Sequence, residues 1–253
     1  MHTEAAPVTP RSTHPTLVLC ELTPTDVPGL ESFSPFCLKA HRALKLAGLT
    51  YSSRHASNPA EHKAHNPTGQ VPVLLVGDRA VPDSTAIMRE IDRLAPGVLD
   101  RGLDARSRAE AWLWEELADT ALNGFLVAAR WADEANWPRV REAYFSTMPA
   151  PVRAVVPALL RRNVVKNLRA RDVWRAGPDA CWSRYGDLLD RLDARAPGEG
   201  FWLGASPTLA DVALFAQLHG LRNRYTPRQS EMIASRRALT AWLDRVDAAT
   251  RGG

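Results

Sequence analysis

The first hundred residues alternate short apolar runs with segments of helical periodicity. Residues 16–22 are β-branched and apolar, which predicts a strand. Pro35 suits the first position of a helix that runs to Ala47 and ends at Gly48. Apolar positions recur at spacings of three and four along this helix, at Cys37, Ala40, Leu44 and Ala47. The pattern therefore predicts a strand followed by a helix with one apolar face.

The same half of the chain predicts three more strands and two more helices. Residues 50–55 predict a second strand, and residues 71–76 and 79–82 flank Gly77-Asp78, a pair typical of a tight hairpin. A helix then begins at Asp83, runs to Ala95 and ends before Pro96-Gly97. The predicted order is β-α-β-α-β-β-α, which indicates an α/β domain.

The second half of the chain is predicted to be helical throughout. Apolar residues recur at helical spacing over 105–131, 180–192 and 236–248. Thr208 and Asp211 lie three residues apart just before another apolar run, which is typical of a capping box at a helix start. We therefore expect a flexible tail over 1–15, an α/β domain over 16–97 and an all-helical domain over 103–250.

Composition narrows the class of protein. The chain has 253 residues, 45% of them hydrophobic and 24% charged, which is typical of a globular protein. It has no apolar run long enough for a transmembrane helix, and its first residues do not resemble a secretory signal. Three cysteines far apart argue against a disulfide framework and favour a cytoplasmic location. A net charge of +4 gives no reason to expect a nucleic-acid partner, and no metal site is predicted.

Four segments in this order carry a family resemblance. They are SPFC at 34–37, NPTGQVPVL at 66–74, DSTAI at 83–87 and FWLGASPTLADVALF at 201–215. Together they resemble glutathione transferases, in which a thioredoxin-like domain precedes an all-helical one. The basic stretch that follows residue 150 is similar to a long helical insertion in larger bacterial members, which are related to metaxin-like and Fax-like proteins. The resemblance implies glutathione as a co-substrate, a small apolar electrophile as its partner in the reaction, and a homodimer.

The resemblance implies that Ser34 is the catalytic residue. A free thiol has a pKa of about 8.5, so an enzyme that uses glutathione must stabilise the thiolate. A hydroxyl donor and the positive end of a helix both do this, and Ser34 lies at the expected N-cap. Because a serine forms no mixed disulfide, this residue favours conjugation over thiol–disulfide exchange. Ser32 is an alternative, and Ser34 alone would suit an ordinary helix cap.

Cys37 has two interpretations. Its place on the apolar face favours a buried side chain. If it were exposed near the helix N-terminus, its pKa would fall and it would be a reactive thiol, which would allow thiol transfer through Cys37 alone.

The resemblance also implies a glutathione-binding surface and an electrophile pocket. The backbone of Val71, before a cis Pro72, would pair with the cysteinyl part of glutathione, while Asp83 and Ser84 would hold the charged γ-glutamyl end. Ser84 and the amides beside it could also be an ordinary helix start. The remaining implied glutathione contacts are Phe36 and Gln70, and the implied electrophile contacts are Trp112, Glu115 and Asp119, which could equally belong to the core.

The basic segment 151–177 contains one acidic residue, Asp172. One interpretation is a solvated basic face with the apolar side chains turned inward. The other is contact with an acidic membrane surface or an anionic substrate. The residues favour the first interpretation. Four functions remain open from the sequence. Three are activities: transfer of glutathione to an apolar electrophile, a glutathione-dependent isomerisation or ring opening, and thiol transfer through Cys37. The fourth is a non-catalytic binding or assembly role on the same fold.

Overall fold

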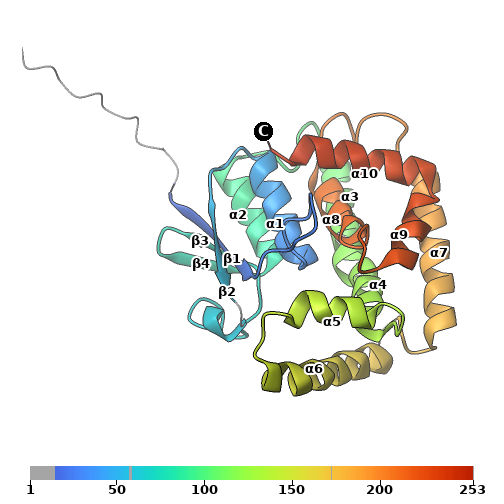
Figure 1. Ribbon diagram of the computed structural model, residues 1–253. Helices are drawn as coiled ribbons and strands as arrows, with labels where there is room; N and C mark the ends of the chain where they lie inside the picture. Colours follow the sequence, from blue (N-terminus) through green and yellow to red (C-terminus); the bar gives the residue numbers. More distant parts are fainter. Residues whose placement is uncertain (1–14, 57–58, 172, 253) are drawn as a thin grey trace, which may run out of the picture.

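The computed structural model describes residues 15–56, 59–171 and 173–252. The expected tail over 1–15 lies outside these ranges except for its last residue. Figure 1 shows a small sheet with two helices on one side of the molecule and a larger group of helices on the other. The predicted succession of a sheet-containing domain and an all-helical domain is therefore confirmed.

The N-terminal domain contains a four-stranded mixed sheet in the order β2-β1-β3-β4. β1 pairs in parallel with β2 and antiparallel with β3, and β3 pairs antiparallel with β4. Between β2 and β3 the described residues form only a short 3-10 turn, Pro59–His62, where a second helix was predicted. The remaining elements are β1 Leu17–Leu22, α1 Pro35–Leu46, β2 Ser52–Ala56, β3 Val73–Val76, β4 Arg79–Pro82 and α2 Ser84–Leu94.

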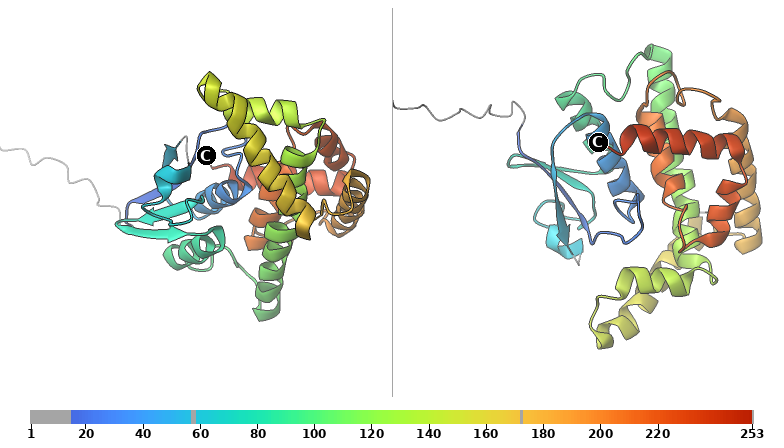
Figure 2. Two further views of the ribbon diagram at one scale, coloured as in Figure 1. Left: turned by 90° about the horizontal axis from the view of Figure 1, so that it is seen from below. Right: turned by 45° about the horizontal axis from the view of Figure 1, so that its top comes forward.

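The helical domain begins with one continuous helical rod that covers the whole of the predicted 105–131 helix. It consists of α3 Ala105–Glu116, a π-helical stretch Leu117–Leu122, α4 Asn123–Val127 and a second π-helical stretch Ala128–Ala132. The other helices are α5 Trp137–Phe145, α6 Ala150–Arg171, α7 Pro178–Arg195, α8 Leu209–His219, α9 Pro227–Ala234 and α10 Arg237–Thr250. Figure 2 shows α8 at the centre of this group, with α5 and α6 at its outer edge.

The predicted capping box at the start of α8 is present and also links three parts of the domain. The fully buried Asp211 carboxylate accepts hydrogen bonds from the Thr208 amide at 2.9 Å and from the Trp202 amide at 2.7 Å. It also accepts one from the Trp242 indole nitrogen on α10 at 2.9 Å. A buried carboxylate is tolerated when its oxygens are hydrogen-bonded, so Asp211 has a structural role.

Two buried cations on α1 connect the domains. Lys39 is fully buried, and its Nζ lies 2.9 Å from the Glu115 carboxylate and also contacts Asp119, both on the first rod of the helical domain. Thr85 at the start of α2 donates a further hydrogen bond to Glu115 at 3.1 Å. Burial raises the pKa of Asp119, and the neighbouring Lys39 opposes that effect. This cluster fixes α1 against the helical rod.

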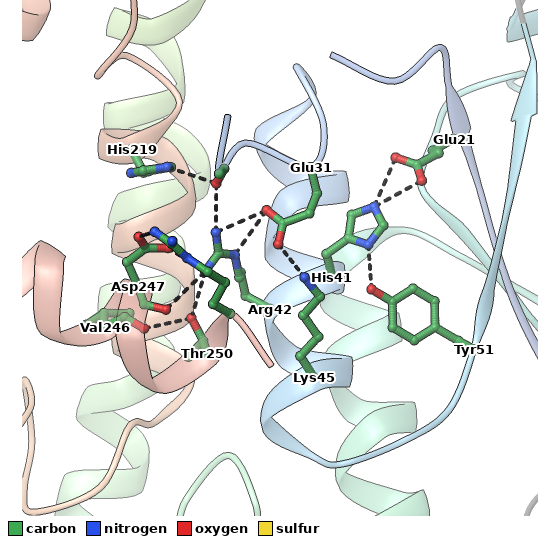
Figure 3. Close-up of polar contacts among 12 residues, drawn as sticks. Glu21, Glu31, His41, Arg42, Lys45, Tyr51, His219, Val246, Asp247 and Thr250 are labelled. Atoms are coloured by element: carbon green, nitrogen blue, oxygen red, sulfur yellow. Dashed lines mark hydrogen bonds and ion pairs between the residues drawn. The ribbon is translucent and has the colours of Figure 1, made fainter. Parts of the chain in front are cut away.

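The second cation, Arg42, is also fully buried and is shown in Figure 3. Its guanidinium lies 2.7 Å from Asp247 on α10 and donates to the Gly29 carbonyl at 2.9 Å. It also donates to Glu31 at 3.2 Å, and Lys45 reaches the same carboxylate at 2.6 Å. Arg42 therefore connects α1 both to the C-terminal helix and to the loop that leads from β1 to α1.

We expect Lys39→Met to reduce the free energy of unfolding by about 3–5 kcal/mol, because it leaves the buried Glu115 carboxylate and the partly buried Asp119 carboxylate without their cation. Urea unfolding measures this loss. Lys45→Met is the matched control, since Lys45 is partly exposed and its loss is expected to cost about 1 kcal/mol or less. A Lys39→Met variant as stable as the control would contradict a cohesive role for the Lys39 cluster.

His219 on α8 predicts a pH dependence of stability. Burial lowers the pKa of His219 to about 4, with Arg222 and Arg42 adding to this effect and Asp247 opposing it, and its Nε2 lies 3.2 Å from the Gly29 carbonyl. In the unfolded chain His219 takes up a proton near the ordinary histidine pKa of about 6.5. Above this pH the side chain is neutral in both states, so its titration costs the folded state no stability. Stability falls as the pH decreases towards 4, by up to about 3 kcal/mol. Urea unfolding of the wild type and His219→Gln at about pH 7 and about pH 5 should give a smaller pH effect in the variant. Equal pH effects would contradict this assignment.

Candidate functional site

A cavity of about 390 Å³ opens between the start of α1, the segment before β3 and the start of α2. Its lining contains all of the residues expected to contact glutathione: Phe36, Gln70, Val71, Pro72, Asp83 and Ser84. It also contains three that the sequence analysis did not select: Asn66, Thr68 and Pro82. The structure thus brings together segments from three separate stretches of chain.

The wall before β3 is shaped by a side-chain turn. Asn66 donates to the Gln70 carbonyl at 2.9 Å and accepts from the Thr68 amide at 3.2 Å and hydroxyl at 2.9 Å. Val71-Pro72 follows with the expected cis peptide bond. Val71 precedes β3 and takes no part in its strand pairing, so its backbone is free to pair with an extended ligand. Asn66 and Thr68 lie inside the NPTGQ segment, which is the signal that could have identified them.

The opposite wall is the start of α2. Asp83 has a φ of 77°, an unusual left-handed conformation for a residue other than glycine, and its carboxylate accepts from the Ala86 amide at 3.1 Å. The first amides of any helix have no partner within the helix, and Ser84, the first residue of α2, lines the cavity. This wall can therefore receive a carboxylate at the amides and an ammonium at Asp83.

Ser34 is the N-cap of α1, as predicted. Its Oγ accepts a hydrogen bond from the Cys37 amide at 3.3 Å, and the side chain is half-buried. A hydroxyl that accepts from an amide still has its own proton to donate. The Ser32 side chain is 2% exposed and accepts from the Ser34 amide at 3.3 Å, so Ser34 is the more accessible of the two hydroxyls. Ser34 does not itself line the cavity, but it lies two residues before Phe36, which does.

The Cys37 thiol is fully buried. Burial raises its pKa to about 12, while the hydroxyls of Ser34 and Ser32 partly oppose the shift and Glu21 adds to it. A thiol in this environment stays protonated at neutral pH, so it is neither a nucleophile nor a reductant. The structure thus favours the interpretation of Cys37 as a core residue over that of a reactive thiol.

Of the three residues implied as electrophile contacts, Glu115 and Asp119 lie together, whereas Trp112 does not join them. Glu115 and Asp119 are occupied by Lys39, as described above. Trp112 is 36% exposed, lies beneath the Arg89 guanidinium at 5.2 Å and lines a separate cavity of about 150 Å³ with residues such as Asp92 and Arg108. Among the described residues, no group of three or more His, Cys, Asp or Glu side chains is placed to hold a metal ion.

Arg130 is a residue near the site that the sequence analysis missed. It is 4% exposed, and its guanidinium contacts the carbonyls of Phe33 and Gly220 and lies 3.1 Å from the Tyr144 hydroxyl. The Phe33 ring packs 5.1 Å from Tyr144 and 5.6 Å from the ring of Tyr225. The helical domain therefore holds the backbone directly before Ser34. The sequence around Arg130 contains no signal for its partner Phe33, which lies almost a hundred residues away in the chain.

Comparison with known proteins agrees with this geometry. A model described as the glutathione S-transferase N-terminal domain matches residues 35–136, and one described as the glutathione S-transferase C-terminal domain matches residues 157–245. Glutathione S-transferase 4 of Zea mays is 30% identical over 170 residues, which cover 64% of this chain and 70% of that protein. The chain belongs to the glutathione S-transferase family.

Two further comparisons extend this result. The protein named Failed axon connections from Drosophila melanogaster is 31% identical over 215 residues, or 77% of this chain, and the match spans 48% of that relative's length. The crystal structure of a glutathione transferase from Phanerochaete chrysosporium has a TM-score of 0.65 at 17% identity, with 94% of this chain and 98% of that chain covered. At this identity the likeness to the fungal protein shows the glutathione transferase fold alone.

We expect Arg130→Met to release the loop before Ser34, because two backbone carbonyls lose their donor. The free energy of unfolding should fall by about 2–4 kcal/mol. Hydrogen exchange at the amides of residues 33–37 should also become faster than in the wild type. Arg139→Met, at an exposed position on α5, is the control and should change neither quantity. Unchanged exchange at 33–37 in Arg130→Met would refute the positioning role.

Proposed function

We propose that this protein is a glutathione transferase that binds glutathione in the 390 Å³ cavity and conjugates it to a small apolar electrophile. The supporting observation is the convergence of the six expected contacts in one cavity beside the N-terminus of α1. The cavity size also lies within the ordinary range for small-molecule sites.

Each part of glutathione has a complementary group in the cavity. The γ-glutamyl carboxylate would accept hydrogen bonds from the first amides of α2 and from the Ser84 hydroxyl. Its ammonium would pair with Asp83. The cysteinyl backbone would pair with Val71, in the manner of an added strand, with Gln70 and Phe36 at its sides. This orientation directs the cysteinyl thiol towards the start of α1 and Ser34.

Ser34 would then stabilise the thiolate without taking its proton. The thiol releases its proton to solvent, and the Ser34 hydroxyl donates a hydrogen bond to the sulfur at the positive end of α1. The sulfur forms a bond to the electrophilic carbon. In a substitution the leaving group departs with the electron pair of the broken bond. In an addition no group leaves, and the carbanion that forms takes a proton from solvent. Lowering the thiol pKa raises the fraction of nucleophile at neutral pH.

Conjugation is favoured over thiol–disulfide exchange for two reasons. Serine replaces the thiol that such exchange would require at position 34, and the other candidate, Cys37, is fully buried. Isomerisation and ring opening would use the same site but regenerate glutathione, so mass analysis of the products distinguishes them from conjugation. A non-catalytic binding protein would have the same fold but would convert no electrophile in the presence of glutathione.

We also expect a homodimer, as is usual in this family. The exposed Trp112 and Leu113 on α3, at 36% and 70% exposure, are apolar side chains that a subunit contact could cover. Sedimentation equilibrium of the intact protein tests this expectation.

We expect Ser34→Ala to lower kcat/KM for conjugation of glutathione to an electrophilic dye by about 100-fold, as for loss of one donor to a developing anion. Thiolate absorbance of bound glutathione against pH should give a pKa at least about one unit higher than in the wild type. The Kd of glutathione should stay nearly unchanged, since most contacts lie elsewhere. Ser32→Ala is the control and should retain activity.

Two results would contradict this proposal in different ways. An unchanged thiol pKa in Ser34→Ala would remove Ser34 from the mechanism while leaving the cavity intact. Calorimetry that detects no glutathione binding by the wild type at millimolar concentration would reject the transferase proposal and favour a non-catalytic role.

A further inference from the structure

Helix α6 exposes apolar side chains that the sequence analysis expected to face inward. Val164, Val165 and Leu168, in its second half, do pack against the core. In its first half the structure turns the large apolar residues outward, with exposures of 42% for Val152, 56% for Val155, 56% for Leu159 and 42% for Leu160. All of the large apolar side chains found most exposed, apart from Trp112 and Leu113, thus lie on this one helix.

The exposed residues form one continuous stripe. Val152, Val155 and Leu159 follow each other at spacings of three and four, so they lie on the same helix face. Arg162 and Lys166 continue the same spacing and are exposed too. The stripe is therefore apolar in the first half of α6 and basic in the second half. We call these five residues, together with Leu160, the α6 surface.

The charge of α6 has one sign. Every charged residue between 150 and 171 is a lysine or an arginine. Arg161 is used within the protein, where it pairs with Glu134 at 2.8 Å and stacks on Trp137 at 4.9 Å. In the part of the chain that the structure describes, the exposed Arg162, Lys166 and Arg169 take part in no ion pair. Their positive charge is thus available to an external partner.

The position of α6 makes this surface accessible. One side of the helix packs on α5 and on Ala128–Ala132, and Figures 1 and 2 place the helix at the outer edge of the molecule, with its other side facing away from the protein. No helix within the described ranges is long and apolar enough to cross a membrane. Contact with a bilayer through α6 would therefore be peripheral.

We propose that the α6 surface docks on the surface of an anionic lipid membrane. Helices that lie in a membrane interface combine apolar side chains, which enter the boundary of the acyl chains, with lysine and arginine side chains that bind lipid phosphates. The α6 surface has both parts on one face. Nothing in this inference depends on glutathione chemistry.

Charge and shape favour lipid over two other occupants. A second copy of the chain that met this whole face through a two-fold axis would set the basic half of one α6 against the basic or the apolar half of the other. Either contact removes positive charge from water without a carboxylate partner, which is unfavourable. An acidic protein would share the charge complementarity but would need a groove to receive a protruding helix. A lipid interface adapts to such a helix without a preformed groove.

The test is flotation of the intact protein with vesicles of phosphatidylcholine alone or with about one-third phosphatidylserine. We expect binding to the anionic vesicles only, weakened by added salt. Arg162→Glu/Lys166→Glu should reduce the partition coefficient at least about 25-fold, from roughly fivefold for each basic residue lost. Val155→Ser/Leu159→Ser should reduce it at least about tenfold through lost apolar burial.

The matched control is Arg139→Glu/Arg191→Glu, which changes the net charge equally at exposed positions on α5 and α7. It should keep at least about one-third of wild-type partitioning. Urea unfolding of every variant shows whether it is folded. The proposal is overturned if the wild type fails to float with anionic vesicles at low salt, or if the control weakens flotation as much as the α6 variants. Capture of the wild type by polyglutamate without flotation would overturn it in favour of an acidic protein partner.

Discussion

The arrangement of this protein depends on two cations buried on one helix. Lys39 and Arg42 lie on α1, inside the N-terminal domain, yet their carboxylate partners include Glu115, Asp119 and Asp247 in the helical domain. Replacing both partners of such a pair with apolar residues can be neutral, but removing one is costly. Buried ion pairs therefore give little stability relative to an apolar contact, but they disfavour any placement of the domains that would separate a buried charge from its partner. The placement that keeps the pairs together fixes α1, at whose N-terminus the candidate site lies.

The site follows from this constraint. α1 presents Ser34 and Phe36 at its first turn, α2 presents Asp83 and Ser84 at its own, and the segment before β3 supplies Val71 between them. Both helix N-termini direct positive electrostatic potential to one region, which suits a ligand with a carboxylate at one end and a thiolate further along. From the other domain, Arg130 holds the Phe33 carbonyl, so the helical domain also determines where Ser34 lies.

The sequence predicted the features that depend on local signals. Helix caps at Ser34, Asp83 and Thr208 depend on neighbouring residues, so pattern and family resemblance located them correctly. The sequence did not predict the contacts that form when distant segments pack together. Lys39 and Glu115 are 76 residues apart and Arg42 and Asp247 are 205 apart, and nothing local indicates such partners. For the same reason the pairing of Glu115 and Asp119 with Lys39 was not predicted. On α6 the apolar side chains were expected to turn inward, but those of the first half are exposed, because the side that packs depends on α5 and the helical rod.

A crystal structure of the protein with bound glutathione tests the central claim most directly, because it fixes the position of every group at once. The account predicts the γ-glutamyl end at Asp83 and Ser84, the cysteinyl backbone paired with Val71, and the sulfur within hydrogen-bonding distance of Ser34 Oγ. An empty cavity at saturating glutathione, or a sulfur directed away from Ser34, would contradict it.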